Sequence, residues 1–311
     1  VMLAGKLLEN AEKLLDMKIH PTVIIKGYRL ASKEAERIIN SEIAIHSDTI
    51  SDLILKYVAM TAMTGKGAEN DKEKLADIVV KAIKKVSEGK KVDLEDIKII
   101  KSKGRAVEDS QLIEGIVLDK ERVSPEMPER IQNARILLID FPLELKNPEG
   151  ESKLSITSPE QLQKFVDREE RVIREMTEKI ISTGANVLFC QKGIDDVAQY
   201  YLSKAGIYAC RRIAKSDMEK LARATHGHIV SSLNEVSPSD LGTSKIVREV
   251  LDGDNERMTY VESCENPKSV SILIRGGTEH VIDEIGRAID DGLGDIASVI
   301  KSGSIIAGAG A

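Results

Sequence analysis

The fold class of this chain is determined by residues 183–212, TGANVLFCQKGIDDVAQYYLSKAGIYACRR. The segment begins with a glycine turn and a short apolar run, Asn186–Cys190, typical of a buried strand. After Gly193, apolar residues recur at spacings of three and four, the period of an amphipathic helix, and Ile207–Arg211 resembles a second strand. The strand, helix and strand predict a compact parallel unit and hence an α/β fold.

The helix in this unit has a wide apolar face, formed by Ile194, Val197, Ala198, Tyr201 and Leu202. The unit has no phosphate-cradling glycine loop, no nucleophile beside a base and no metal-ligand spacing. We therefore interpret it as a surface for binding rather than for catalysis.

The overall composition predicts a folded chain of about two domains. With 311 residues, 41% of them hydrophobic, the chain is long enough to bury a sizeable core. A formal net charge of −6 argues against a nucleic-acid partner, because neutralising phosphates requires a basic face. The charged first segment is unlike a signal peptide, and no apolar run is long enough to cross a membrane.

The three cysteines, Cys190, Cys210 and Cys264, are far apart and form no CxxC motif. An odd number without pairing signals favours a reducing compartment, so we expect a cytoplasmic protein. His226 and His228 could lie on one side of a strand, but no third ligand is nearby and we expect no metal site. The abrupt ends of the sequence suggest a piece of a longer chain.

The order of elements is helical, then mixed, then helical again. Pro159–Ile181 is predicted to be a long helix, Ser216–Glu219 a capping box, and Glu279–Leu293 a last strong helix. This order predicts a mixed domain inserted into a helical one. Gly115 and the Gly276–Gly277 pair lie where the chain leaves and returns, so they are either hinges or plain turns.

Three short motifs are ambiguous from the residues alone. The loop around Lys66, TGKGAEN, lacks the upstream glycine of a P-loop, and a solvated lysine is the simpler interpretation. Gly308 and Gly310 could let a phosphate approach the backbone or simply form a turn. Asp290 and Asp291 are expected to be solvated carboxylates that diverge by about 100° around a helix.

The whole chain resembles the group II chaperonins. The motifs that carry the resemblance are IHPTVIIKGY (19–28), MTGKGAE (63–69), LDKERV (118–123), GANVLFCQKGIDDVAQYYL (184–202), NPKSVSILIRGGTEHV (266–281) and IDDGL (289–293). The resemblance implies a mixed α/β apical domain inserted into a helical intermediate domain, with fragments of an all-α equatorial domain at both ends. The implied boundaries are 1–46 and 302–311 for equatorial fragments, 47–114 and 276–301 for the intermediate domain, and 115–275 for the apical domain.

The resemblance also implies roles for individual residues. Asp291 corresponds to the carboxylate that positions the water attacking ATP, and Lys66 to a nucleotide-sensing lysine. Gly308 and Gly310 fall at a nucleotide contact, although Ala309 departs from the family's glycine triplet. Side chains expected to bind unfolded clients are Ile194, Val197, Tyr201, Leu202, Met218 and Leu221. Those expected in a protrusion that acts as a lid are Leu154, Ile156, Leu162 and Phe165.

The implied function is that of a subunit of an ATP-dependent chaperonin, which works with ATP and Mg²⁺ in a double ring of subunits and encloses unfolded proteins. The family's phosphate-binding loops have no counterpart in this sequence, so we expect the 311 residues alone to be inactive as an ATPase. The alternative is a nucleotide-independent holdase that only binds clients. A stand-alone metabolic enzyme is disfavoured because no compact catalytic set exists.

Overall fold

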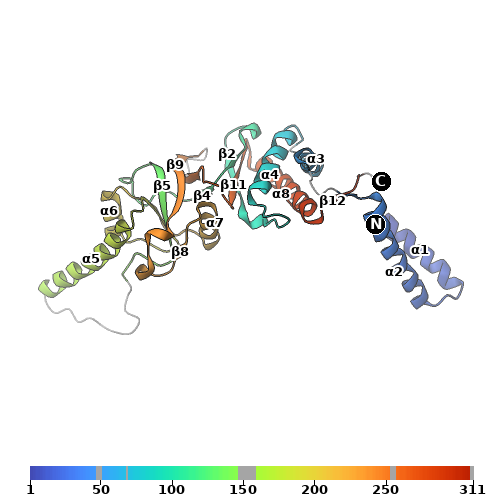
Figure 1. Cartoon of the computed structure of the whole chain (residues 1–311), viewed down its shortest axis with the longest axis horizontal. Helices are drawn as coiled ribbons and strands as arrows, with labels where there is room; N and C mark the ends of the chain where they lie inside the picture. Colours follow the sequence, from blue (N-terminus) through green and yellow to red (C-terminus); the bar gives the residue numbers. More distant parts are fainter. Residues whose placement is uncertain (47–50, 68, 146–158, 253–256, 309–311) are drawn as a thin grey trace. The chain divides into compact units, whose positions relative to one another are not determined.

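A computed structural model describes residues 1–46, 51–67, 69–145, 159–252 and 257–308. The chain forms two units (Figure 1). The first contains residues 1–50 and 302–311, and the second contains residues 51–301.

The first unit is a helical hairpin with a small sheet. Its elements are α1 (Met2–Asp16), α2 (Pro21–Ile38), a π-helical turn (Ile39–Ile43), and the antiparallel strands β1 (Ile45–His46) and β12 (Ser304–Ile305). Pro21 occupies the first turn of α2, and His20 caps the helix by accepting a hydrogen bond from the Thr22 N–H. Within α1 and α2 only Ile24 is buried.

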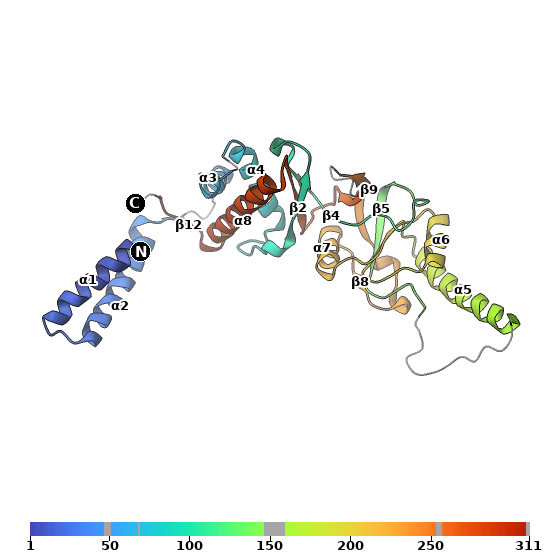
Figure 2. The same cartoon turned by 180° about the vertical axis from the view of Figure 1, so that it is seen from behind.

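The second unit contains a three-stranded sheet covered by helices. The strand order is β2, β11, β3, with β11 parallel to β2 and antiparallel to β3. The bounds are β2 (Ile97–Lys103), β3 (Gln111–Ile113), β11 (Val270–Gly276), α3 (Asp52–Met63), α4 (Lys72–Val86) and α8 (Glu279–Ser302). The three helices lie together beside this sheet in both views (Figures 1 and 2). Gly292 permits close packing there, because a Cβ at this position would lie 3.2 Å from Met63 Cε.

The second unit also contains a seven-stranded sheet, in which β8 pairs with β5 beside the path β4, β10, β9, β5, β6, β7. The strands are β4 (Ile116–Leu118), β5 (Arg130–Ile139), β6 (Val187–Cys190), β7 (Tyr208–Cys210), β8 (Ile229–Val230), β9 (Gly242–Leu251) and β10 (Arg257–Glu262). The helices are α5 (Pro159–Ser182), α6 (Asp196–Lys204) and α7 (Lys215–Thr225).

Alternate residues of β5 face two different apolar layers. Ile136 and Leu138 belong to a cluster with Met218 and Leu221 of α7, whereas Leu137 and Ile139 belong to a cluster with residues of α5 and α6. Because successive side chains in a strand point to opposite faces, the sheet carries α7 on one face and α5 with α6 on the other.

The strand–helix–strand unit predicted from residues 183–212 is confirmed. β6 and β7 are parallel neighbours, with α6 as the crossover between them. The helix begins where Asp195 accepts a hydrogen bond from the Val197 N–H, so the aspartate satisfies one of the free N–H groups of the first turn.

Other local predictions differ from the structure. The residue capping α7 is Ala214, which has no side-chain hydrogen bond, so the capping box predicted at Ser216–Glu219 is wrong. α8 continues to Ser302 rather than ending near Leu293. β11 pairs with β2 and β3, so residues 270–275 lie in the three-stranded sheet, whereas the expected domain boundary was at residue 275.

The three cysteines supply a test of this fold. Cys190, Cys210 and Cys264 are buried, and burial raises the pKa of each thiol to about 12. Because the thiolate is the reactive form, the native chain should not react with a thiol reagent at mildly alkaline pH. All three thiols should react after denaturation. The absorbance of the product that the reagent releases measures the number of thiols that have reacted.

A Leu251→Cys variant is the matched control, since Leu251 is exposed on β9 and its replacement should react at once. Rapid labelling of the native cysteines without denaturant would contradict the buried positions.

Candidate functional site

Lys66 and Asp291 are brought together from opposite ends of the second unit's sequence. Lys66 lies on the loop between α3 and α4, and Asp291 lies on α8, 225 residues later. The Lys66 ammonium group forms an ion pair with Asp291 Oδ2. Both side chains remain accessible to solvent, so other charged groups can reach this pair.

The loop that carries Lys66 is held by two carboxylates. The Gly65 N–H donates to Glu69 Oε2 at 2.8 Å, and the Gly67 N–H donates to Glu284 Oε1 at 3.0 Å. Glu284 precedes Asp291 by seven residues, about two helical turns, so both project from one face of α8. Glu284 is not among the residues predicted from the sequence, because its contact with Gly67 spans 217 residues of the chain.

Asp290 has a different environment from Asp291. The residue as a whole is exposed, but its carboxyl group is partly shielded, and burial raises its pKa. Lys101 lowers that pKa, and the neighbouring Asp291 raises it further. Asp290 is exposed, as expected for a solvated carboxylate, whereas Asp291 is accessible to solvent but forms an ion pair with Lys66.

The described residues of the loop do not form a phosphate cradle. The N–H groups of Gly65 and Gly67 are already used by Glu69 and Glu284. In the described part of the site there is therefore one cation for a phosphate oxygen and one carboxylate for a water molecule, but no backbone nest that could hold ATP by itself. Gly308 is exposed and belongs to the first unit, and Gly310 lies outside the described residues.

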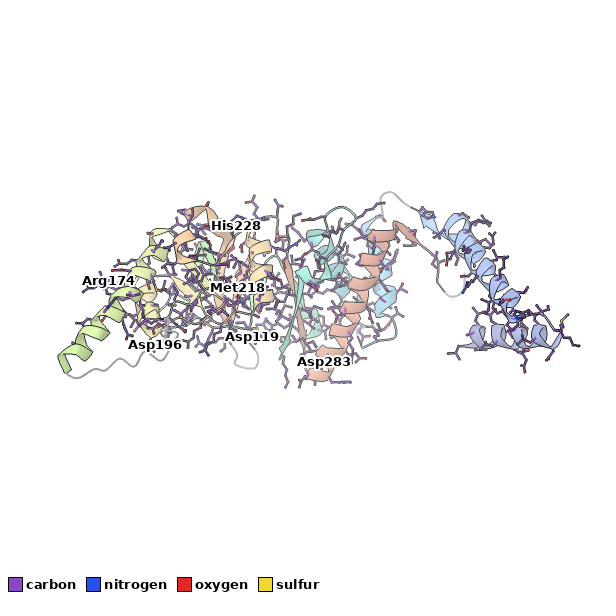
Figure 3. The ribbon with its side chains drawn as sticks, turned by 90° about the horizontal axis from the view of Figure 1, so that it is seen from below. Asp119, Arg174, Asp196, Met218, His228 and Asp283 are labelled. Atoms are coloured by element: carbon purple, nitrogen blue, oxygen red, sulfur yellow. The ribbon has the colours of Figure 1, made fainter. Side chains whose placement is uncertain are left out.

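Most of the side chains expected to bind clients are in the core. Ile194, Leu202, Met218 and Leu221 are each at most 1% exposed, so the expectation that they form an open surface is wrong. Figure 3 shows Met218 among the side chains of the seven-stranded sheet. The physical reason is that α6 and α7 use these residues to cover opposite faces of the sheet.

An exposed surface nevertheless remains where α5 and α6 meet, and we call it the α5–α6 ridge. It consists of Arg174, Val197, Tyr200 and Tyr201. The two tyrosine rings make an edge contact at 5.4 Å between centroids, and the Arg174 guanidinium lies over the Tyr201 ring at 5.7 Å. Tyr200 is 55% exposed, while Val197 and Tyr201 are half-buried.

The candidate hinge glycines differ in their surroundings. Gly115 has φ +146°, and a Cβ there would lie 2.1 Å from the Val261 carbonyl oxygen. A Cβ on Gly276 would lie 2.7 Å from Ile282 Cγ1, whereas Gly277 has open space around it. Close packing therefore requires glycine at positions 115 and 276, whether or not these two glycines act as hinges.

The candidate lid residues are only partly described. Leu154 and Ile156 lie outside the described residues. Leu162 and Phe165 belong to α5, but their side chains are not described.

The described residues contain no cluster of three or more His, Cys, Asp or Glu side chains that could hold a metal ion. The two candidate histidines have other contacts: His226 Nε2 lies 3.0 Å from the Glu265 carbonyl oxygen, and His228 Nδ1 lies 3.7 Å from an Asp240 carboxylate oxygen. Among the helices of the described segments, none is long and apolar enough to cross a bilayer.

The known proteins that are similar to this chain include chaperonins and thermosome subunits. The model of the TCP-1/cpn60 chaperonin family matches residues 1–311. The chain is 52% identical to thermosome subunit beta of Archaeoglobus fulgidus and 51% identical to the thermosome subunit of Methanopyrus kandleri. Each alignment covers all of this chain but only 57% of the relative.

A solved structure, the open-state monomer of a group II chaperonin from Methanococcoides burtonii, is 41% identical with a TM-score of 0.71. The match covers 98% of this chain and 71% of that one. With the family model matching from the first residue to the last, the chain belongs to the TCP-1/cpn60 chaperonin family.

Proposed function

We propose that this chain is part of a subunit of an ATP-dependent group II chaperonin that binds and encloses unfolded proteins. The subunit works in the cytoplasm within a double ring of subunits and uses ATP with Mg²⁺. The thermosome names of relatives about half identical to this chain support the proposal, as does its similarity to a group II chaperonin monomer.

The observation that carries the proposal is the Lys66–Asp291 ion pair. It joins the residue proposed to sense nucleotide to the residue proposed to position water, although they lie far apart in sequence. Phosphoryl transfer depends mainly on positioning and on charge stabilisation. Asp291 therefore orients the attacking water only against a phosphate that equatorial residues hold, and Lys66 responds to that phosphate's charge.

Replacing Asp291 tests this role. In the assembled subunit, Asp291→Asn should leave ATP binding nearly intact. It should slow hydrolysis by roughly 10²–10⁴-fold, the usual loss when a group that accepts a proton or orients the attacking water is removed. Phosphate release and nucleotide affinity are the two measurements.

Two neighbouring carboxylates on α8 serve as controls. Asp290→Asn and Asp295→Asn should change hydrolysis little, because neither pairs with Lys66. A larger loss from Asp290 than from Asp291 would show that the wrong carboxylate has been assigned.

We further infer that clients bind at the α5–α6 ridge. Contiguous exposed apolar surface marks binding sites on soluble proteins. Tyr200 is exposed there, Val197 and Tyr201 are half-buried beside it, and Arg174 adds a cation beside the aromatic rings. The described side chains of α5 before Ile173 are exposed or half-buried, which supports the proposal that this half of the helix belongs to a protrusion.

Tyr200→Ser should weaken suppression of aggregation of a denatured client without lowering thermal stability. The Tyr200 side chain is exposed, so its loss removes contact area for the client but little core packing. Light scattering of the client and the unfolding temperature of the variant are the measurements.

Leu202→Ala gives the opposite pattern, because Leu202 is buried and its truncation should cost about 2–5 kcal/mol of stability. Leu251→Ser removes an equally exposed apolar residue elsewhere and should leave suppression intact. Unchanged suppression by Tyr200→Ser would reject the ridge as the client site.

A further inference from the structure

The Lys66–Asp291 ion pair is too exposed to hold the loop between α3 and α4 in place by itself. The side chains of Lys66 and Asp291 are 34% and 58% exposed. Water and salt compete with an ion pair of this kind, so the pair contributes little to keeping two segments in one arrangement. Other contacts must therefore determine how the loop lies along α8.

The start of the loop is anchored by apolar packing. Met63, the last residue of α3, is buried, and its Cε lies 3.2 Å from the position that a Cβ on Gly292 of α8 would occupy. Apolar contact is not directional. This packing brings the end of α3 close to α8, but it does not determine the direction in which the following residues run.

Glu284 supplies a directional contact between the loop and α8. It is half-buried, and its carboxylate accepts a hydrogen bond from the Gly67 N–H at 3.0 Å. A hydrogen bond to a charged acceptor is stronger than one between neutral groups, and its geometry is specific. Because Gly67 directly follows Lys66, this bond fixes the backbone from which the lysine side chain extends.

The two carboxylates of α8 hold the loop at two points along the helix. Glu284 and Asp291 are seven residues apart, about 10 Å along the helix axis. Glu284 binds the backbone at Gly67, and Asp291 binds the Lys66 ammonium group. The lysine side chain therefore runs along α8 from Glu284 toward Asp291.

Glycine at position 67 is required by the close approach of Glu284. A Cβ on Gly67 would lie 2.6 Å from Glu284 Cδ, closer than packed atoms approach. Gly67 does not have a positive φ, whereas the φ of Gly65 is +74°. The backbone at Gly67 therefore accepts any residue. A methyl group there would displace the Glu284 carboxylate and leave the backbone unstrained.

The Gly65 side of the loop is held locally. The Gly65 N–H donates to Glu69, and the Glu69 carboxylate also pairs with Lys72 of α4. Lys72 in the first place, and the Gly65 N–H in the second, lower the pKa of Glu69 and keep it ionised. These contacts shape the loop without reaching α8, so the contact of Glu284 with Gly67 is what orients its backbone on that helix.

We propose that Glu284 is a positioning residue for Lys66. By binding the Gly67 N–H, Glu284 holds the loop against α8, so that the Lys66 ammonium group and the Asp291 carboxylate meet the nucleotide as one preformed pair. This inference rests on the proposed function, in which Lys66 responds to the charge of a phosphate. Glu284 acts through Lys66 and not by contact with the nucleotide.

A double-mutant cycle in the assembled subunit tests the proposal. Glu284→Met removes the acceptor of the Gly67 N–H, and Lys66→Met removes the ammonium group. The measurement is the affinity for a non-hydrolysable ATP analogue relative to the affinity for ADP, each with Mg²⁺, because ADP lacks the terminal phosphate. Glu284→Met alone should lower this ratio several-fold, up to about tenfold, the scale for losing one hydrogen bond to a charged group. In the Lys66→Met background it should have no further effect.

Three further variants separate positioning from a general loss of structure. Glu284→Gln keeps an oxygen that can accept the Gly67 N–H and should retain most of the ratio. Gly67→Ala displaces the Glu284 carboxylate without removing its charge and should reproduce Glu284→Met. Asp283→Asn is the matched control: it removes the 2.6 Å pair with Lys101 from the same helix and should leave the ratio unchanged.

Additive losses from Glu284→Met and Lys66→Met would overturn the inference, since Glu284 would then act independently of the lysine. A normal ratio in Glu284→Met, when Lys66→Met lowers it, would also overturn the inference but leave the proposed function intact. No effect from Lys66→Met would reject the proposed role of Lys66 and this inference with it. The unfolding temperature shows whether each variant has folded, and Gly67→Ala replaces Glu284→Met in the cycle if the latter does not fold.

Discussion

The arrangement of the second unit depends on β11, a strand whose seven residues are all buried. A strand covered on both faces must satisfy its polar side chains internally. Ser271 does so by accepting a hydrogen bond from the Val117 N–H, and Arg275 does so with Asp252. Both contacts reach the seven-stranded sheet. β11 then leads directly into α8, which carries Glu284 and Asp291, so one strand orients both the neighbouring sheet and the candidate site.

The sequence predicted the elements whose signal is local and strongly periodic. The β6–α6–β7 unit was recognisable because two short apolar runs flank a helix with three- and four-residue spacing. The helix from Pro159 was recognisable for the same reason. Lys66 and Asp291 were identified only through family resemblance. Nothing in the spacing of these two residues shows that an ion pair would join them.

The sequence could not show which apolar faces remain exposed. The same periodicity describes a core helix and a client-binding helix, and only the packing of α5 beside α6 decides that Leu202 is buried and Tyr200 is not. The Glu284 contact with Gly67 was also out of reach, because it depends on how a loop packs against a helix more than 200 residues away. Contacts of this kind follow from tertiary packing rather than from local pattern.

The helical hairpin of the first unit has a calorimetric consequence. Only Ile24 is buried within α1 and α2, while Met2, Leu3, Leu8 and Met17 are exposed. The heat capacity of unfolding arises chiefly from apolar surface that becomes hydrated on unfolding. The hairpin on its own exposes little new apolar surface when it melts. The thermogram of this chain therefore reports the unfolding of residues 51–301, and loss of the hairpin adds almost nothing to its heat-capacity step.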